Sequence, residues 1–264
     1  MRILFLNAWG GAEFDQLQEW LPQVKADVIC LQEVTRTPGL AGWTQFADGE
    51  RTLPQRADLF RDMKELLRSH EGQFVTSDSG PVYDHEGNRH RQDFGIALFV
   101  DQQIPVIGCE ASFVHGRFID HLEWTISDRP RVAQAIRIVD RSSKRIVTVG
   151  HLHGLRDPAG KSDTPARMNQ AHELKQLLER VAEPDDLVLV GGDLNLLPES
   201  ATFATLAEIG LTELVGYADT RTSLYKKPVR HANYLLVSNP EDVHELDIPA
   251  APIVSDHRPL IVDI

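Results

Sequence analysis

Cysteine is scarce in this chain, which has only Cys30 and Cys109 among its 264 residues. Both lie in apolar, strand-like surroundings far apart in the sequence, which favours reduced core thiols over a disulfide or a metal pair. No apolar run approaches the length that crosses a membrane, and a first strand expected from Arg2 or Ile3 leaves no room for a signal peptide. These features predict a cytoplasmic protein without a membrane span.

The chain also lacks an obvious linker, an internal repeat and an excess of positive charge. No Gly-, Ser- or Pro-rich segment divides it, so residues 1–264 are predicted to form one domain, with 42% apolar residues for its core. Acidic residues outnumber basic ones by 39 to 27, which gives a formal net charge of −12. This charge works against nonspecific attraction to a phosphate backbone, so a protein that tracks along duplex nucleic acid is disfavoured.

Short apolar runs bounded by turn residues predict buried strands at residues 3–6, 28–31, 187–190 and 253–254. Apolar residues at helical spacing predict helices within 14–24, 57–70, 164–181 and 199–209, and the middle third is rich in further strands. We expect an α/β protein in which two sheets pack face to face with helices outside. Residues 35–56, 76–93 and 115–130 are expected to be loops that carry specificity.

Each of the four buried runs leads into polar residues that suit a site. These residues are Asn7, Glu33, the pair Asp193 and Asn195, and the pair Asp256 and His257. Because ligands gather at the carboxyl ends of strands in α/β sheets, the four clusters are predicted to share one pocket. Each cluster alone also fits a turn or a surface position, but their joint occurrence at four strand ends indicates a site.

The residue types favour phosphoester chemistry that is assisted by a metal. A carboxylate such as Glu33 at the end of a buried strand is costly unless it is paired or bound to a cation. Mg²⁺ prefers oxygen ligands and is often held by one or two carboxylates plus phosphate oxygens of a substrate. Asn7 and Asp256 are the expected neighbours of Glu33. Two positions apart on one strand, Asp193 and Asn195 face the same way and can hold an attacking water and a phosphoryl oxygen.

Two histidines on another strand end, His151 and His153, also share one face. Either imidazole can donate a hydrogen bond to a phosphoryl oxygen. The sequence does not choose between them. Lys161, Arg167 and Arg117 are weaker candidates for phosphate contacts, since solvated loop charges explain them as well.

Taken together, these motifs resemble the endonuclease/exonuclease/phosphatase superfamily, which includes DNase I-like nucleases, deadenylases, sphingomyelinases and inositol polyphosphate phosphatases. The resemblance runs from Asn7 to the C-terminus, and its anchors are Leu6-Asn7, Leu31-Gln32-Glu33-Val34, His151-Leu152-His153-Gly154, Gly192-Asp193-Leu194-Asn195 and Ser255-Asp256-His257. It implies a four-layer α/β sandwich, with two packed mixed β-sheets flanked by helices. It also implies Mg²⁺-dependent phosphoester hydrolysis by in-line attack of an activated water, with Mn²⁺ as a possible substitute.

The resemblance also implies roles for the individual residues. Glu33 would be the main metal ligand, with Asn7 and Asp256 near the metal. Asp193 would orient or deprotonate the attacking water, and Asn195 would support the phosphate. His153, or His151 in another register, would bind the phosphate, while His257 would stabilise charge that develops on the phosphoryl group. Whether one or two metal ions take part stays open.

The chain departs from the family pattern at Asn233, where relatives usually have an Asp that pairs with the site histidine. Asn can accept a hydrogen bond and fix the imidazole tautomer, but it lacks the negative charge that favours an imidazolium. We therefore expect a lower pKa for His257 than in relatives, with activity retained but shifted in pH.

The expected partner is a phosphoester substrate, either a small molecule or a short or terminal nucleic acid, and a monomer is favoured. Two alternatives remain. The Gly-His-Leu-His segment is similar to one motif of calcineurin-like binuclear metallophosphoesterases, although the order of motifs differs. The other alternative, suggested by Asn233, is a phosphate-binding module of the same fold with weakened catalysis.

Overall fold

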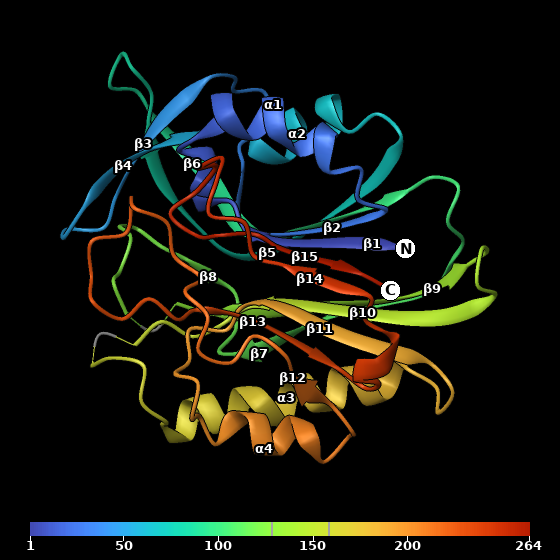
Figure 1. The fold of residues 1–264 in the computed structure, drawn as a ribbon. Helices are drawn as coiled ribbons and strands as arrows, with labels where there is room; N and C mark the ends of the chain where they lie inside the picture. Colours follow the sequence, from blue (N-terminus) through green and yellow to red (C-terminus); the bar gives the residue numbers. More distant parts are fainter. Residues whose placement is uncertain (128, 158) are drawn as a thin grey trace.

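The computed structural model of this protein describes residues 1–127, 129–157 and 159–264, and it places two mixed β-sheets face to face (Figure 1). One is nine-stranded, in the order β14-β15-β1-β2-β6-β5-β3-β4 with β8 paired to β5. Its strands are β1 (Arg2–Asn7), β2 (Val28–Arg36), β3 (Trp43–Ala47), β4 (Thr52–Arg56), β5 (His70–Tyr83), β6 (Arg89–Asp101), β8 (Ile119–Asp120), β14 (Glu245–Asp247) and β15 (Leu260–Asp263). The other is six-stranded, in the order β12-β13-β11-β10-β9-β7. Its strands are β7 (Val106–His115), β9 (Arg131–Asp140), β10 (Arg145–His153), β11 (Leu187–Asp193), β12 (Thr212–Glu213) and β13 (Asn233–Val237).

Helices cover the outer face of each sheet, as the four-layer prediction requires. In Figure 1, α1 (Phe14–Val24) and α2 (Leu59–Leu66) lie on the nine-stranded sheet, while α3 (Pro165–Val181) and α4 (Thr202–Ala207) lie on the six-stranded one. The start of α3 follows from its sequence, because the Thr164 hydroxyl accepts from the backbone N–H of Arg167 and Pro165 occupies the first turn. Short 3₁₀ turns occur at η1 (Trp9–Gly11) and η2 (Pro240–Asp242).

Alternation along the central strands divides the apolar side chains between two cores. On β1, Ile3 and Phe5 belong to the core between the sheets, whereas Leu4 and Leu6 pack in the core that includes residues of α1 and α2. Gly191 on β11 allows the sheets to approach at this point, since a Cβ atom there would lie 2.8 Å from the Phe5 ring. Full burial on both sides explains the continuous apolar runs seen in the sequence. Cys30 is buried as predicted, whereas Cys109 is exposed because it lies on β7, the edge strand of the six-stranded sheet, which corrects its prediction as a core thiol.

Two of the expected loops are strands, and one expected strand is not formed, which corrects the sequence prediction. Residues 253–254 belong to no strand, and Val254 is apolar because it packs in the core beside α1 and α2. Strand β2 continues past residue 31 to Arg36. Most of residues 35–56 forms the end of β2 and the β3–β4 hairpin, and most of residues 76–93 belongs to the long β5–β6 hairpin. Residues 115–130 hold only the two-residue β8 after the end of β7, and residue 128 lies outside the described part. No helix in the described part of the chain is long and apolar enough to cross a membrane.

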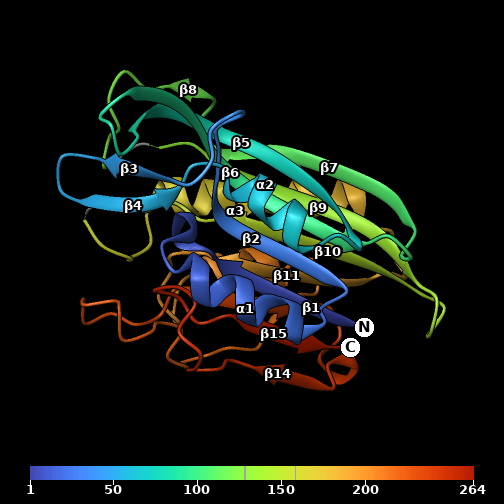
Figure 2. The ribbon, with the colours of Figure 1, turned by 90° about the horizontal axis from the view of Figure 1, so that it is seen from above.

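The strand register brings distant polar residues to one end of the molecule. The parallel pair β1 and β2 aligns Asn7 with Gln32, and the parallel pair β10 and β11 aligns His153 with Asp193. Antiparallel pairing of β11 with β13 sets Asn233 beside Asp193. Figures 1 and 2 show the two termini together at the opposite end from the β3–β4 hairpin.

Candidate active site

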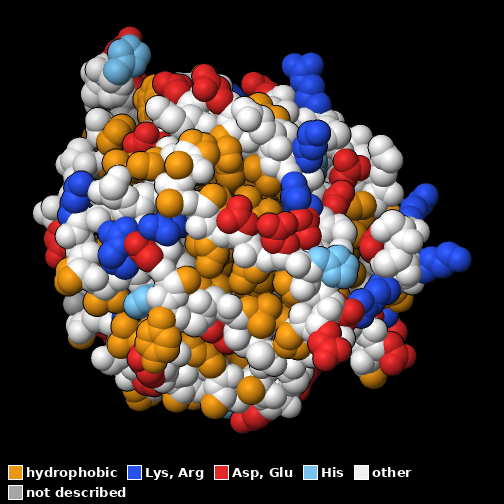
Figure 3. Space-filling view, viewed as in Figure 1, with side chains coloured by type: hydrophobic (Ala, Val, Ile, Leu, Met, Phe, Trp, Pro, Cys, Tyr) orange, Lys and Arg blue, Asp and Glu red, His pale blue; other side chains and the backbone are white. Residues whose placement is uncertain are grey.

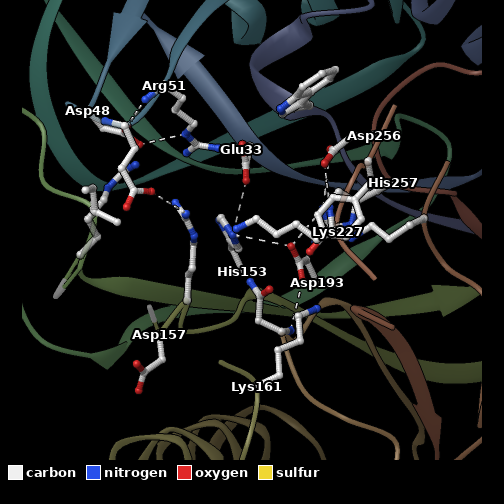
Figure 4. A pocket seen from close by; sticks show the side chains of 18 of the residues that line it. Glu33, Asp48, Arg51, His153, Asp157, Lys161, Asp193, Lys227, Asp256 and His257 are labelled. Atoms are coloured by element: carbon white, nitrogen blue, oxygen red, sulfur yellow. Dashed lines mark hydrogen bonds and ion pairs between the residues drawn. The ribbon is translucent and has the colours of Figure 1, made fainter. Parts of the chain in front are cut away.

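A pocket of about 700 Å³ opens where these strand ends meet, and side chains from both sheets line it (Figure 4). Its lining includes Glu33, His153, Asp193, Asn195, Asp256 and His257. Lys and Arg side chains outnumber Asp and Glu among the described residues that line it, in a protein with a net charge of −12. The pocket is therefore more favourable to anions than the rest of the molecule.

Asp193 lies at the centre of the predicted residues and is 1% exposed. Its Oδ2 accepts a hydrogen bond from Asn7 Nδ2 at 3.0 Å and lies 3.3 Å from His257 Nε2 and 3.8 Å from His153 Nε2. Burial raises the pKa of Asp193 more than the charge of Arg221 lowers it. A carboxyl group with a raised pKa is suited to receive a proton during a reaction.

Glu33 reaches the pocket because β2 is irregular at this point. The register with β6 shifts between Gln32 and Val34, and Glu33 has a left-handed φ of 53°. Such bulges turn a side chain out of its ladder and are common beside active sites. The Glu33 carboxylate accepts from Asn7 Nδ2 at 3.1 Å and lies 3.6 Å from His153 Nε2. Figure 4 shows it pointing toward His153.

Left-handed backbone recurs around this pocket. Besides Glu33, Trp9 has a φ of 52° and Asn195 a φ of 55°. Non-glycine residues adopt this region rarely and at a free-energy cost, and such residues cluster at functional sites. All three line the pocket.

Asn7 connects the two carboxylates. Its Oδ1 accepts from the Trp9 backbone N–H at 3.0 Å, so its amide NH₂ group faces Glu33 and Asp193. In this arrangement Asn7 orients Glu33, the predicted main metal ligand, and Asp193, the predicted partner of the attacking water. Its place beside a metal stays a prediction.

His257 and Asn233 are paired as the sequence suggested. His257 Nδ1 and Asn233 Oδ1 are 2.6 Å apart, and Asn233 Nδ2 donates to the Arg258 carbonyl at 2.7 Å. The amide oxygen therefore faces the ring, Nδ1 carries the hydrogen, and Nε2 points to Asp193. Burial lowers the pKa of His257 well below its usual value, and the charges of Arg221 and Lys161 lower it further.

The structure separates the two candidate histidines. His153 lines the pocket, whereas His151 is completely buried one pleat away, with Nδ1 3.4 Å from Gln32 Nε2 and Nε2 3.3 Å from Gln134 Oε1. Burial lowers the pKa of His151 to about 3, so its ring is neutral. His153 is thus placed with the other predicted residues, and His151 lies behind them between the sheets.

Asn195 follows Asp193 closely. Its backbone N–H donates to Asp193 Oδ1 at 3.1 Å, and its side-chain Nδ2 lies 3.4 Å from the Gly154 carbonyl. The Arg131 guanidinium donates to the same carbonyl at 2.9 Å and lines the pocket. Burial lowers the pKa of Arg131 to about 10, which still leaves it charged near neutral pH.

Asp256 has a partner that the sequence did not reveal. Its Oδ2 accepts from Arg221 Nη1 at 2.8 Å, and its buried Oδ1 has no hydrogen-bond partner within the described parts of the chain. Burial raises the pKa of Asp256 to about 7, more than Arg221 lowers it. Arg221 belongs to no motif and lies 35 residues before Asp256, so no local sequence signal identified it.

The three weaker candidates differ in position. Lys161 lines the pocket and donates to the His231 carbonyl, and burial lowers its pKa to about 8. Arg167 also lines the pocket, but it is buried and donates to the carbonyls of Ser162, Leu155 and Gly160, so its hydrogen bonds hold the loop before α3. Arg117 is exposed and does not line this pocket.

Comparison with known proteins agrees with the motifs. The sequence model of the endonuclease/exonuclease/phosphatase family matches residues 4–257, which is nearly the whole chain. No match was found among curated proteins.

Solved structures share the fold at low sequence identity. An endonuclease/exonuclease/phosphatase family protein from Bacteroides thetaiotaomicron has a TM-score of 0.65 and 13% identity, and the match covers 99% of this chain and 96% of that one. A mannosyl-6-phosphatase from the same organism has a TM-score of 0.64 and 13% identity, over 100% and 98% of the two chains. The human Nocturnin catalytic domain with a bound sulfate anion has a TM-score of 0.60 and 18% identity, over 99% and 93%.

Proposed function

The chain belongs to the endonuclease/exonuclease/phosphatase family, and from this premise we propose that it is a Mg²⁺-dependent phosphoester hydrolase. Members of this family generally hydrolyse phosphoesters and typically use a divalent metal. The proposed reaction is in-line attack of an activated water on phosphorus, with departure of the leaving oxygen on the opposite side.

The observation that carries this proposal is the environment of Asp193 Oδ2. The Nδ1–H of His257 points at Asn233, so in the neutral ring Nε2 carries a lone pair. This lone pair faces Asp193 Oδ2 at 3.3 Å, and the contact is unfavourable when Asp193 is ionised. Without a proton between them the lone pair and the carboxylate repel, so the proton-free pair has a high affinity for one proton. Such a pair can take a proton from a water molecule and keep it within the site.

The oxygen donors of the site fit a divalent ion of the magnesium type. Within the described ranges, no three His, Cys, Asp or Glu side chains form a group that could hold a metal by themselves. Mg²⁺ needs no such group, because it usually keeps several waters and takes only one or two carboxylates plus substrate oxygens. Glu33 and the unpartnered Oδ1 of Asp256 would hold the ion, with Asn7 beside them. When bound, Mg²⁺ or Mn²⁺ would neutralise charge on the phosphoryl oxygens.

The remaining residues would bind and orient the substrate. His153 and Asn195 would donate hydrogen bonds to phosphoryl oxygens, and His257 would stabilise the charge that develops there. Asp193 would orient the attacking water and receive its proton. His151 is placed to support the packing behind His153, and we assign it no contact with substrate.

The pocket supports a small or terminal phosphoester as substrate. Most of its Lys and Arg side chains are buried or half-buried, and Lys226 and Lys227 lie on its exposed rim. The face drawn in Figure 3 shows acidic and basic side chains interspersed, with no continuous basic surface. Duplex binding usually needs such a surface. Because both sheets contribute to one site, we propose that the chain acts as one domain, and nothing in the proposed chemistry requires a second copy.

Of the two alternative functions considered from the sequence, one is excluded and one remains. The family match and the fold exclude a calcineurin-like enzyme. A binding module with weakened catalysis remains the competing proposal, since Asn233 is the feature that suggested it.

The test is a Mg²⁺-dependent hydrolysis screen across sugar and inositol phosphates, aryl phosphodiesters, sphingomyelin, RNA, and single-stranded and abasic DNA. Asp193→Ala is expected to lower kcat on the best substrate by roughly 10²- to 10⁴-fold, the usual contribution of a general base. The matched control is Asp247→Ala, which removes an exposed carboxylate from β14 and should not change kcat. Equal turnover by wild type and Asp193→Ala, or no turnover of any substrate, contradicts the proposal.

A further inference from the structure

Arg221 is anchored at the edge of the pocket by its backbone. It forms an isolated antiparallel bridge with His257, and on either side the Thr222 N–H donates to the Asp256 carbonyl and the Arg258 N–H to the Thr220 carbonyl. The carbonyl of Arg221 accepts from Arg230 Nη2 at 2.7 Å and from Arg258 Nε at 3.0 Å. These contacts fix the point from which its side chain enters the site.

The guanidinium is held inside the pocket with part of its hydrogen-bonding capacity unused. Arg221 is 5% exposed, donates from Nη1 to Asp256 Oδ2 at 2.8 Å, and lies 4.1 Å from the ring centre of Tyr225. Its buried Nε has no hydrogen-bond partner within the described ranges, and Nη2 has none there either. Because Nε has almost no accessible surface, Nη2 is the donor that a ligand in the pocket can reach, and a phosphoryl oxygen there would give it a charged acceptor.

The position of this charge matters because the site already concentrates carboxylates. Asn7 Nδ2 lies 3.1 Å from Glu33 Oε1 and 3.0 Å from Asp193 Oδ2. His257 Nε2 lies 3.3 Å from Asp193 Oδ2 and 3.8 Å from Asp256 Oδ1. The three carboxylates are therefore linked through shared neighbours in one pocket. A second divalent ion is one way to neutralise such a group. An arginine is another, because its charge is permanent and needs no ion from solution.

We propose that Arg221 is a fixed cation that neutralises Asp256 in place of a second divalent ion and offers its free donors to a phosphoryl oxygen of the substrate. The site then binds one divalent ion per chain, held by Glu33 and by the Oδ1 side of Asp256. This inference rests on the proposed function, and it adds a phosphate-binding residue that belongs to none of the recognised motifs.

Binding experiments without turnover test this assignment. Mn²⁺ stoichiometry would be measured by electron paramagnetic resonance, and inorganic phosphate affinity by calorimetry, on wild type, Arg221→Gln and Arg221→Lys. Wild type is expected to bind one Mn²⁺. Arg221→Gln is expected to bind a second Mn²⁺ and to lose on the order of tenfold to a hundredfold in phosphate affinity, the value of a lost charged hydrogen bond.

Arg221→Lys keeps the charge and loses the planar fork, so it should still bind one Mn²⁺ but hold phosphate more weakly than wild type. It also keeps the test valid if Arg221→Gln does not fold. Lys226→Gln is the matched control, since it removes one positive charge from the exposed rim of the same pocket. This control should retain a stoichiometry of one.

The possible failures are distinguishable. A wild type that binds two Mn²⁺ ions, or an Arg221→Gln variant that matches wild type in both measurements, overturns the role of Arg221 and leaves the proposed function standing. A wild type that binds no Mn²⁺ and hydrolyses no phosphoester overturns both.

Discussion

Replacing Asn233 with Asp is expected to raise the pKa of His257 and to move the activity profile to higher pH. Asn233 Oδ1 lies 2.6 Å from His257 Nδ1, and both side chains are buried. A carboxylate in this position would face an imidazolium across a single hydrogen bond. Because the opposite charge favours the protonated ring, the shift has a defined sign.

The size of the shift follows from the separation of the charges. Two unit charges about 4 Å apart at an effective dielectric constant of about 20 attract by about 4 kcal/mol. That energy corresponds to about three pH units at 1.36 kcal/mol for each unit. The new carboxylate also loses water and can no longer donate to the Arg258 carbonyl, which Asn233 Nδ2 now reaches at 2.7 Å. We therefore expect a rise of about one to two pH units.

Two measurements would record the change. The Cε1–H resonance of His257 gives its pKa directly by NMR, and kcat/KM against pH gives the limb of the profile that depends on it. Asn169→Asp is the matched control, since it introduces the same charge on an exposed position of α3. If the resonance and the profile of Asn233→Asp both superimpose on those of wild type, the reasoning about this pair is wrong.

Two further predictions concern stability. Folded His151 has a pKa of about 3 and an ordinary unfolded pKa of about 6.5, so wild type should lose about 1.4 kcal/mol of unfolding free energy per pH unit as pH falls below 6.5. His151→Asn removes that loss. In urea unfolding, the free energy of unfolding of the variant minus that of wild type should therefore rise by about 1.4 kcal/mol for each pH unit below 6.5. A difference between the two proteins that does not change with pH contradicts the assignment. Asp78 is buried and accepts two hydrogen bonds from Arg129 at 2.7 and 3.1 Å, so Asp78→Asn leaves a buried cation unpaired. Urea unfolding should show a loss of about 3–5 kcal/mol, and a loss below about 1 kcal/mol would show that the pair is not needed.

The errors of the sequence prediction have physical causes. Strand β3 was missed because its buried positions are Thr44 and Phe46, so its inward face is not consistently apolar. The middle of β5 was missed because Ser77, Asp78 and Ser79 are polar yet buried. Asp78 is tolerated there because Arg129 and His121 arrive from another part of the chain, and periodicity within one strand contains no information about such partners.

What the sequence determined by itself is the set of polar clusters beside apolar runs, and their order along the chain was enough to identify the family. Asn7 and Asp193 do end buried strands, whereas Glu33 lies inside β2 and the pair Asp256 and His257 precedes β15. Tertiary structure decided which way each side chain points and which distant residues it contacts. A bulge turns Glu33 into the pocket, a difference of one pleat separates His153 from His151, and a bridge to His257 brings in Arg221 from a segment without a motif. The positions of these side chains depend on how strands that are distant in the sequence pair and pack, so they are set by the tertiary structure.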